Sequence, residues 1–182
     1  MDKNKKASEN SPLGVGGKTL LIIRHAKSSW DDISLSDFER PLNDRGKTDA
    51  PKMASRLRKR KIEIDAFISS PARRAKKTAE YFIKEFGEKA DDIILVSALY
   101  DAATNNFSDT IKDIDDKYKS AAIFSHNPGI TAFANQLVDK ANIDNMPTCS
   151  IFAVKANVEK WKDFAKAKKD FLFFDYPKKE EE

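Results

Sequence analysis

The sequence predicts a three-layer α/β/α domain with a mostly parallel central sheet, and two observations lead to that prediction. Short apolar runs of β-type composition alternate along the chain with segments whose apolar residues recur at helical spacing. The runs are continuous rather than alternating, which is typical of strands that are covered by helices on both faces. With 182 residues and no internal repeat or linker, the chain is long enough for one domain with its own hydrophobic core.

Five segments are predicted to be strands, and a sixth short candidate lies near the C-terminus. All are rich in β-branched or aromatic residues, as strands usually are. They cover residues 19–24, 65–70, 92–97, 121–126 and 150–155 and, for the sixth, 171–174.

Four helices are predicted between these strands, and the sequence indicates where some of them begin and end. Ser70 followed by a proline is typical of a helix start, and Gly87 is typical of the position just past a helix end. Pro51 is expected in the first turn of another helix, with Thr48 or Asp49 as its cap, because proline is tolerated there. The predicted helices cover residues 49–60, 71–86, 106–118 and 128–138.

The two ends of the chain are predicted to lie outside the domain, which is expected over residues 18–177. Residues 1–17 are polar and rich in Gly and Ser, as in a flexible leader, and residues 178–182 form a charged tail. The leader has no hydrophobic segment of the signal-peptide type. No apolar run approaches the roughly 18 residues that a membrane span requires, so no membrane partner is expected.

Charge and cysteine content narrow the expected binding partners and the expected cellular compartment. The 33 basic residues are interleaved with 29 acidic ones, so the net charge of +4 does not predict a basic face for nucleic acid. The single cysteine, Cys149, cannot form an intrachain disulfide and fits a reducing compartment, so a cytoplasmic location is expected. The sequence leaves the oligomeric state open.

Polar residues that suit phosphate binding follow several of the predicted strands. Arg24 and His25 end the first strand, and His126, the second of only two histidines, ends the fourth. Arg73 and Arg74 lie in the first turns of the helix after the second strand, and Asp101 follows the third. In open α/β sheets, ligands bind beyond the carboxyl ends of the strands, so these side chains are expected to converge at one edge of the sheet.

The residue types favour phosphate chemistry over other chemistries. Arginine presents a rigid fork of donors that matches phosphate oxygens, and a neutral imidazole among such groups can attack phosphorus. A metal site is not favoured because the histidines lack a ligand-pair spacing. No GxSxG turn predicts a serine nucleophile, and no Gly-rich turn predicts dinucleotide binding.

Four segments resemble motifs of the histidine phosphatase superfamily, the phosphoglycerate-mutase-like enzymes. RHAKS resembles the RHG signature, SSPARRAKKTAE the element S-x-x-x-R-A-x-x-T-A, ERPLNDRGKTDA the P-L-T-x-x-G-x-x-Q-A turn, and SHNPG the element of the second histidine. Their order and strand context agree over residues 18–177. The short length and the RHAKSSW, SHNPG and NMPTCSIF segments are most similar to the SixA branch, the phosphohistidine phosphatases.

This resemblance implies a phosphoglycerate-mutase-like fold and a division of labour. His25 would attack phosphorus and become phosphohistidine. Arg24, Arg74 and His126 would hold the equatorial oxygens, with His126 as a protonated clamp favoured by the nearby phosphate. Water would then hydrolyse the phosphoenzyme, and neither a metal ion nor an organic cofactor is needed.

Three further residues are expected near the reacting groups. Asp101 stands where many relatives carry a glutamate general acid, and its alternative role is a cap for the next helix. Ser28 and Asn43 are expected beside the pocket as substrate-binding residues, with Asn43 where threonine is common in the family.

The expected substrate is phosphohistidine on a protein, or a small phosphoester. A mutase and a non-catalytic phosphate-binding module are the alternatives. A mutase usually needs extra lid segments to exclude water, for which this chain has little length. No long insertion forms a specificity cap, so a shallow site that suits a phosphorylated protein side chain is expected.

Overall fold

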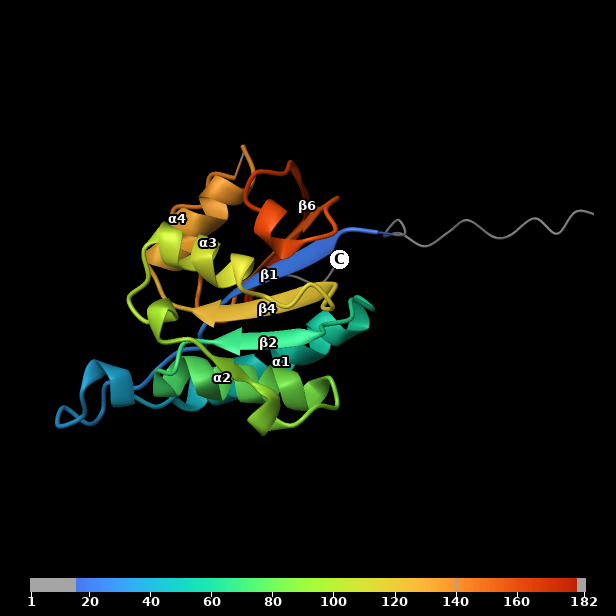
Figure 1. Cartoon of the computed structure of the whole chain (residues 1–182). Helices are drawn as coiled ribbons and strands as arrows, with labels where there is room; N and C mark the ends of the chain where they lie inside the picture. Colours follow the sequence, from blue (N-terminus) through green and yellow to red (C-terminus); the bar gives the residue numbers. More distant parts are fainter. Residues whose placement is uncertain (1–15, 140, 180–182) are drawn as a thin grey trace, which may run out of the picture.

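The structure is a computed structural model that describes residues 16–139 and 141–179, in which six strands form one mixed sheet with the order β3-β2-β4-β1-β5-β6 (Figure 1). The strands β3, β2, β4 and β1 run parallel to one another. In contrast, β5 is antiparallel to β1, and β6 is antiparallel to β5. The bounds are β1 (Lys18–Arg24), β2 (Ala66–Ser69), β3 (Ile94–Leu95), β4 (Ser120–Ser125), β5 (Ile151–Ala156) and β6 (Lys169–Asp175).

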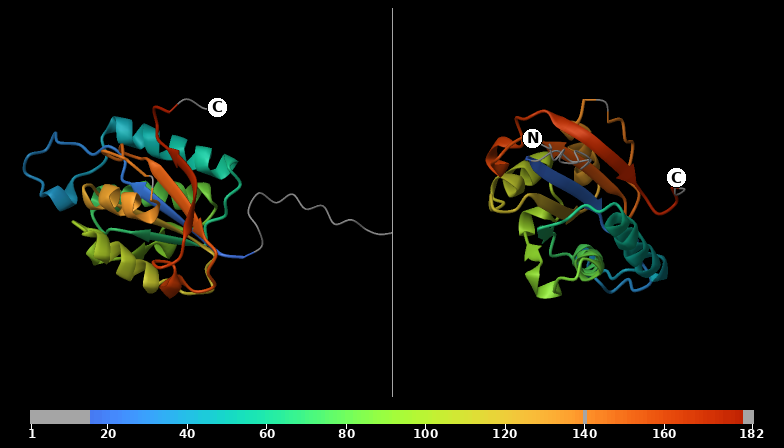
Figure 2. Two further views of the ribbon diagram at one scale, coloured as in Figure 1. Left: turned by 90° about the horizontal axis from the view of Figure 1, so that it is seen from above. Right: turned by 90° about the vertical axis from the view of Figure 1, so that its right-hand side faces the viewer.

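The helices cover both faces of this sheet, which confirms the predicted three-layer α/β/α fold (Figures 1 and 2). The pair α1 and α2 lies on one face, and the pair α3 and α4 lies on the other. Their bounds are α1 (Asp44–Lys59), α2 (Arg73–Glu85), α3 (Thr104–Lys112) and α4 (Gly129–Leu137). Four 3₁₀ helices complete the described secondary structure: η1 (Asp37–Glu39), η2 (Ala90–Asp92), η3 (Ser97–Leu99) and η4 (Trp161–Asp163).

The central strand β1 shows why the apolar runs are continuous. Its residues Leu20 and Ile22 pack into the core beneath α3 and α4, whereas Leu21 and Ile23 pack into the core beneath α1 and α2. All four side chains are completely buried. A strand with helices on both faces has no solvent-facing side, so every position in it favours an apolar residue.

Helix α1 begins at Asp44, so the predicted start near residue 49 is wrong. The Oδ1 atom of Asn43 accepts a hydrogen bond of 2.8 Å from the main-chain N–H of Gly46, which makes Asn43 the N-cap. Pro51 therefore lies inside the helix rather than in its first turn. The cap stabilises an earlier start than the position of the proline alone predicts.

Other element ends also differ from the predictions. Helix α2 begins at Arg73 with Ala72 as the residue before it, and Ser70 makes no cap to this helix. Helix α3 ends at Lys112, six residues before the predicted end at Tyr118. The third strand, at the edge of the sheet, is only two residues long, Ile94 and Leu95, and both are exposed.

The expectations for the chain ends fall mostly outside the described residues. Residues 1–15 of the predicted leader and 180–182 of the predicted tail are not described. The first described strand, β1, begins at Lys18. Lys179, from the predicted tail, donates hydrogen bonds from its Nζ and main-chain N to Phe174 and Tyr176. In the described part of the chain, no helix is both long and apolar enough to cross a bilayer.

Candidate active site

The two histidines meet because they follow neighbouring strands in matching register. Arg24 and Ser125 are paired on the parallel strands β1 and β4, so the residues after them, His25 and His126, leave the sheet side by side. Their ring centroids are 5.0 Å apart, and both side chains are buried. The carboxyl edge of the sheet therefore brings together two imidazoles that are far apart in the sequence.

The contacts of His25 determine which ring nitrogen carries the proton. Its Nδ1 lies 2.7 Å from the main-chain oxygen of Ala26. Since a carbonyl oxygen can only accept, Nδ1 is protonated and Nε2 keeps its lone pair. Burial, together with the positive charges of Arg74 and Arg24 and the neighbouring His126, holds the pKa of His25 well below its usual value. His25 is thus a neutral imidazole whose Nε2 carries the lone pair that a nucleophile requires.

Arg74 faces this lone pair from the first turn of α2. Its Nε lies 3.3 Å from His25 Nε2. Thr78, one turn later, donates a hydrogen bond of 2.7 Å to the main-chain oxygen of Arg74 and accepts one of 3.0 Å from the main-chain N–H of Ala26. The threonine therefore joins the start of α2 to the residue after His25, which fixes the arginine relative to the imidazole.

His126 is held by Ser70, which follows β2. Its Nε2 lies 2.8 Å from Ser70 Oγ, and this oxygen also accepts a hydrogen bond of 3.3 Å from the main-chain N–H of Ala72. When Ser70 donates its own proton to Nε2, both functions of the hydroxyl are used and the imidazole proton lies on Nδ1. The Nδ1 atom is buried and has no partner among the described residues.

The protein's own groups do not favour the protonated form of His126, which the resemblance attributes to the nearby phosphate. Burial and the positive charge of Arg74 lower the pKa of His126 to about 3. The ring is therefore neutral at neutral pH when no anion is bound. A neutral imidazole with its proton on Nδ1 can still donate one hydrogen bond, so protonation is not required for it to bind an oxygen.

Arg24 reaches the site from the end of β1 and is anchored by the segment before β5. Its Nη1 donates to the main-chain oxygen of Met146 at 2.6 Å and to Asn145 Oδ1 at 3.3 Å. Its Nε is buried without a partner among the described residues. The main-chain N–H of Cys149 contacts the carbonyl oxygens of Arg24 and His25 at 3.1 Å each. Cys149 itself is completely buried, and burial raises the pKa of its thiol.

Asp37 is a site residue that the sequence analysis did not identify. Its Oδ2 accepts hydrogen bonds from Arg74 Nη2 at 2.8 Å and from the Tyr100 hydroxyl at 3.0 Å. Although burial alone would raise it, the hydrogen bonds from Arg74 and Tyr100 hold the pKa of Asp37 at about 2. In the sequence, Asp37 is one of several acidic residues in a polar segment, and nothing there distinguishes it from a turn residue.

Asp101 lies apart from these contacts. It is exposed, has a positive φ of 52°, and makes no hydrogen bond or ion pair with another described side chain. Its alternative role as a helix cap is wrong, because the main-chain N–H of Ala103 at the start of α3 is bound by Asn106 Oδ1 at 2.9 Å. A catalytic role for Asp101 stays a prediction.

Ser28 and Asn43 are both engaged in holding the loop between β1 and α1. Ser28 is buried, and its Oγ accepts a hydrogen bond of 2.6 Å from Arg40 Nη2. Asn43 caps α1 through Gly46, where a Cβ atom would lie 2.1 Å from the main-chain oxygen of Lys27. Glycine is therefore required for the close approach of the helix to this loop. Substrate binding by Ser28 and Asn43 stays a prediction.

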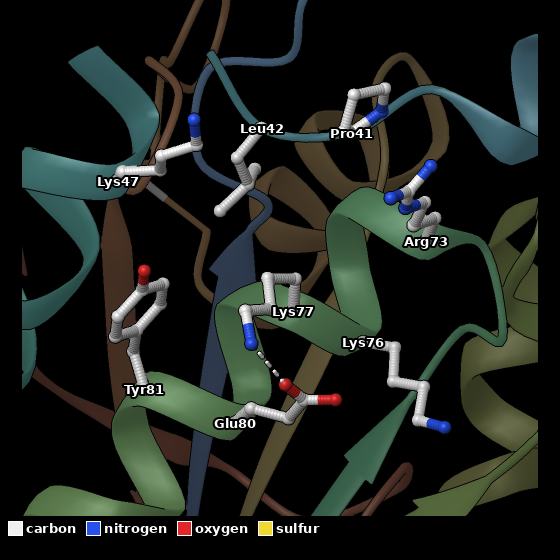
Figure 3. Close-up of a pocket in the computed structure, with 8 residues that line it drawn as sticks. All are labelled: Pro41, Leu42, Lys47, Arg73, Lys76, Lys77, Glu80 and Tyr81. Atoms are coloured by element: carbon white, nitrogen blue, oxygen red, sulfur yellow. Dashed lines mark hydrogen bonds and ion pairs between the residues drawn. The ribbon is translucent and has the colours of Figure 1, made fainter. Parts of the chain in front are cut away.

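A positively charged hollow of about 400 Å³ lies beside the start of α2 (Figure 3). Its only carboxylate, Glu80, is paired with Lys77 at 2.8 Å. Arg73, the residue before Arg74, lies on its wall, whereas Arg24, His25, Arg74 and His126 do not line it. The lining residues are Pro41, Leu42, Lys47, Arg73, Lys76, Lys77, Glu80 and Tyr81.

The arrangement of nitrogen donors around a nucleophilic nitrogen suits an oxyanion. Arg24 Nε and His126 Nδ1 are buried donors that find no partner in the described part of the chain, and such atoms are costly unless a ligand or water satisfies them. Arg74 adds a charged donor next to His25 Nε2. Among residues 16–139 and 141–179, no three His, Cys, Asp or Glu side chains cluster as a metal site would require. These donors can hold the oxygens of a phosphoryl group while the imidazole attacks phosphorus.

Comparisons with known proteins show which proteins this chain resembles. Residues 20–101 match the model of the histidine phosphatase superfamily (branch 1). An uncharacterized chloroplastic protein of Arabidopsis thaliana is 29% identical over 161 residues, which cover 84% of this chain and 73% of that protein. The 2,3-bisphosphoglycerate-dependent phosphoglycerate mutase of Bartonella tribocorum is 28% identical over 99 residues, which cover 53% of this chain and 48% of the mutase. The matched region thus spans about half the length of that enzyme.

Solved structures share the fold along nearly their whole length. The protein histidine phosphatase SixA complexed with tungstate superposes with a TM-score of 0.74 at 21% identity, covering 87% of this chain and 97% of that one. At this level of identity, the likeness shows a common fold. The family match covers the segment that carries Arg24, His25 and Arg74, so this part of the chain is similar to the histidine phosphatase superfamily (branch 1).

Proposed function

We propose that this protein is a phosphatase that works through a phosphohistidine intermediate at His25. The observation that supports it most directly is the geometry of one ring. The Nδ1 atom of His25 is held by the main-chain oxygen of Ala26 at 2.7 Å, and its Nε2 lies 3.3 Å from the charged guanidinium of Arg74. A neutral imidazole with its lone pair directed at a phosphate-binding group is arranged for attack on phosphorus.

In the first proposed step, the lone pair of His25 Nε2 forms a bond to phosphorus as the bond from phosphorus to the leaving group breaks. The leaving group departs with the electron pair of that bond and takes up a proton. Arg74, Arg24 and the Nδ1–H of His126 stabilise the negative charge on the three equatorial oxygens. In the second step, water attacks phosphorus, inorganic phosphate leaves, and His25 returns to its neutral form.

The substrate that we propose is phosphohistidine on a protein, as for the SixA enzymes that share this fold. One feature of the site supports this over an alkyl phosphoester. The carboxylate that contacts Arg74 belongs to Asp37, whose pKa of about 2 keeps it ionised at neutral pH, so it cannot donate a proton to a leaving group. An alkoxide needs such a proton in the transition state, whereas the imidazole of phosphohistidine can carry a proton from solvent before it departs.

The test is a turnover screen that pairs a histidine-phosphorylated protein with alkyl phosphoesters and sugar phosphates. We expect release of phosphate from the phosphohistidine protein at a kcat/KM well above that for the esters. Brief mixing with a ³²P-labelled substrate should label the enzyme through an acid-labile bond, and His25→Ala should carry no label. The exposed variant Lys112→Ala serves as the control.

Three outcomes would contradict the proposal. Preference for small esters would reassign the substrate, and isomerisation of a phosphorylated sugar acid without release of phosphate would favour a mutase. Oxyanion binding without any turnover would favour a phosphate-binding module.

A further inference from the structure

We propose that Asp37 is a positioning residue that orients Arg74 toward His25. The inference rests on the phosphatase function proposed above and adds to it a residue from the loop of residues 26–43, which extends beyond the strand ends (Figure 1). Asp37 contacts the guanidinium group rather than His25, so it acts on the reaction through Arg74.

The two terminal nitrogens of Arg74 are both held by Asp37. Arg74 Nη1 donates to the main-chain oxygen of Asp37, and Arg74 Nη2 donates to its Oδ2 at 2.8 Å. The guanidinium is planar, so fixing both terminal nitrogens also fixes the direction of the Nε–H bond. That bond faces His25 Nε2 at 3.3 Å. The orientation of Arg74 is therefore set from its outer end.

This arrangement keeps one edge of the guanidinium clear of Asp37. Each terminal nitrogen of arginine carries two hydrogens, and Nη2 uses one of them for Asp37. Its second hydrogen lies on the same edge of the guanidinium as Nε–H, the edge that faces His25. Two parallel N–H groups on one edge match two oxygens of a phosphoryl group. Asp37 thus occupies the outer end of the guanidinium and leaves the inner edge for phosphate.

Asp37 is itself held by two other side chains, although half of it is exposed to solvent. Arg40 Nη1 donates to its Oδ1 at 2.9 Å, and the hydroxyl of Tyr100 donates to its Oδ2 at 3.0 Å. Arg40 is buried and is fixed in turn by Ser28 Oγ and the main-chain oxygen of Ser29, at 2.6 and 2.9 Å. A carboxylate held from three directions is a rigid support rather than a mobile surface group.

The first test is the variant Asp37→Asn, which keeps the shape of the side chain and removes its charge. We expect kcat/KM for the phosphohistidine protein to fall about 10- to 100-fold, because a misplaced binding group weakens transition-state stabilisation. Asp37→Glu, which keeps the charge, should recover part of the loss. The matched control is Asp32→Asn in the same loop, whose carboxylate binds only the main-chain N–H and hydroxyl of Ser34 among the described residues.

A double-mutant cycle distinguishes positioning from general structural damage. If Asp37 acts through Arg74, adding Asp37→Asn to Arg74→Ala should lower kcat/KM by less than about threefold. The rise in melting temperature produced by vanadate should be smaller for Asp37→Asn than for the wild type, while the melting temperature without vanadate changes little.

The proposal is overturned if Asp37→Asn has wild-type kinetics, or if its effect is multiplicative with that of Arg74→Ala. It is also overturned if the loss of activity only follows a loss of stability. Failure of the proposed function is a different result: the wild type would show no turnover that depends on His25. The vanadate comparison would still report whether Asp37 orients Arg74.

Discussion

Arg24 and Ser125 are register partners on the parallel strands β1 and β4, and the residue after each of them is a histidine. This single pairing places the imidazoles of His25 and His126 with their centroids 5.0 Å apart. The sheet thus brings together, from two separate strand ends, the nucleophile and the oxyanion donor that we propose. The predictions below concern these two histidines, the serine that holds His126, and Asp101.

Replacing His25 by alanine should abolish turnover while the fold is retained. The change removes the atom that would carry the phosphoryl group, so kcat should fall by about 10³-fold or more. Phosphate or vanadate should still raise the melting temperature of the wild type, because the anion binds only the native state. Steady-state kinetics and thermal unfolding measure the two effects, and unchanged turnover would rule out His25 as the nucleophile.

Removing the hydroxyl of Ser70 should reduce activity through His126. The hydroxyl lies 2.8 Å from His126 Nε2 and favours the tautomer with its proton on Nδ1. Without it, the ring can adopt the tautomer that offers no donor, so Ser70→Ala should lower kcat/KM by roughly tenfold or more. Ser69→Ala is the control, because Ser69 is equally buried but donates to the main-chain oxygen of Ser70. Equal effects of the two substitutions would contradict this role for the hydroxyl.

Stability should decrease on acidification because of His126. In the unfolded chain, this histidine takes up a proton near its ordinary pKa of 6.5, whereas in the folded protein burial and Arg74 lower the pKa to about 3. Between these values the unfolded state binds more protons, so the free energy of unfolding falls as the pH falls from about 6.5 toward about 3. Urea unfolding across this range should show a shallower pH dependence for His126→Asn. An unchanged slope would indicate that His126 is protonated in the folded protein.

Asp101→Asn should affect phosphoesters and phosphohistidine differently. If this residue supplies a proton, its loss should slow alkyl phosphoester hydrolysis by about 10²–10⁴-fold. Phosphohistidine hydrolysis should slow only mildly, since its leaving group can be protonated by solvent. Both substrates are assayed on one preparation, with circular dichroism as the folding control. Equal and large losses would point to a structural effect, and no loss on either substrate would remove Asp101 from the mechanism.

The layers of the fold could be predicted because they depend on local patterns. The run from Leu20 to Ile23 is apolar at every position, and the structure buries alternate residues against helices on opposite faces. Burial of apolar surface is the main driving force of folding, and it produces a repeating apolar pattern along the chain. This pattern can be recognised in the sequence alone. The strand ends that carry His25 and His126 were identified for the same reason.

The tertiary structure decided which polar groups meet, because such contacts join residues that are distant in sequence. Ser70 has the pattern of a helix cap, yet its hydroxyl binds His126 from another strand. The start of α1 is a different case, because its cap joins Asn43 to the nearby Gly46 and competes with the signal from Pro51. Asp37 gains its role only when the loop brings it to Arg74. A single hydrogen bond leaves no periodic pattern in the sequence, so its partner is determined by packing alone.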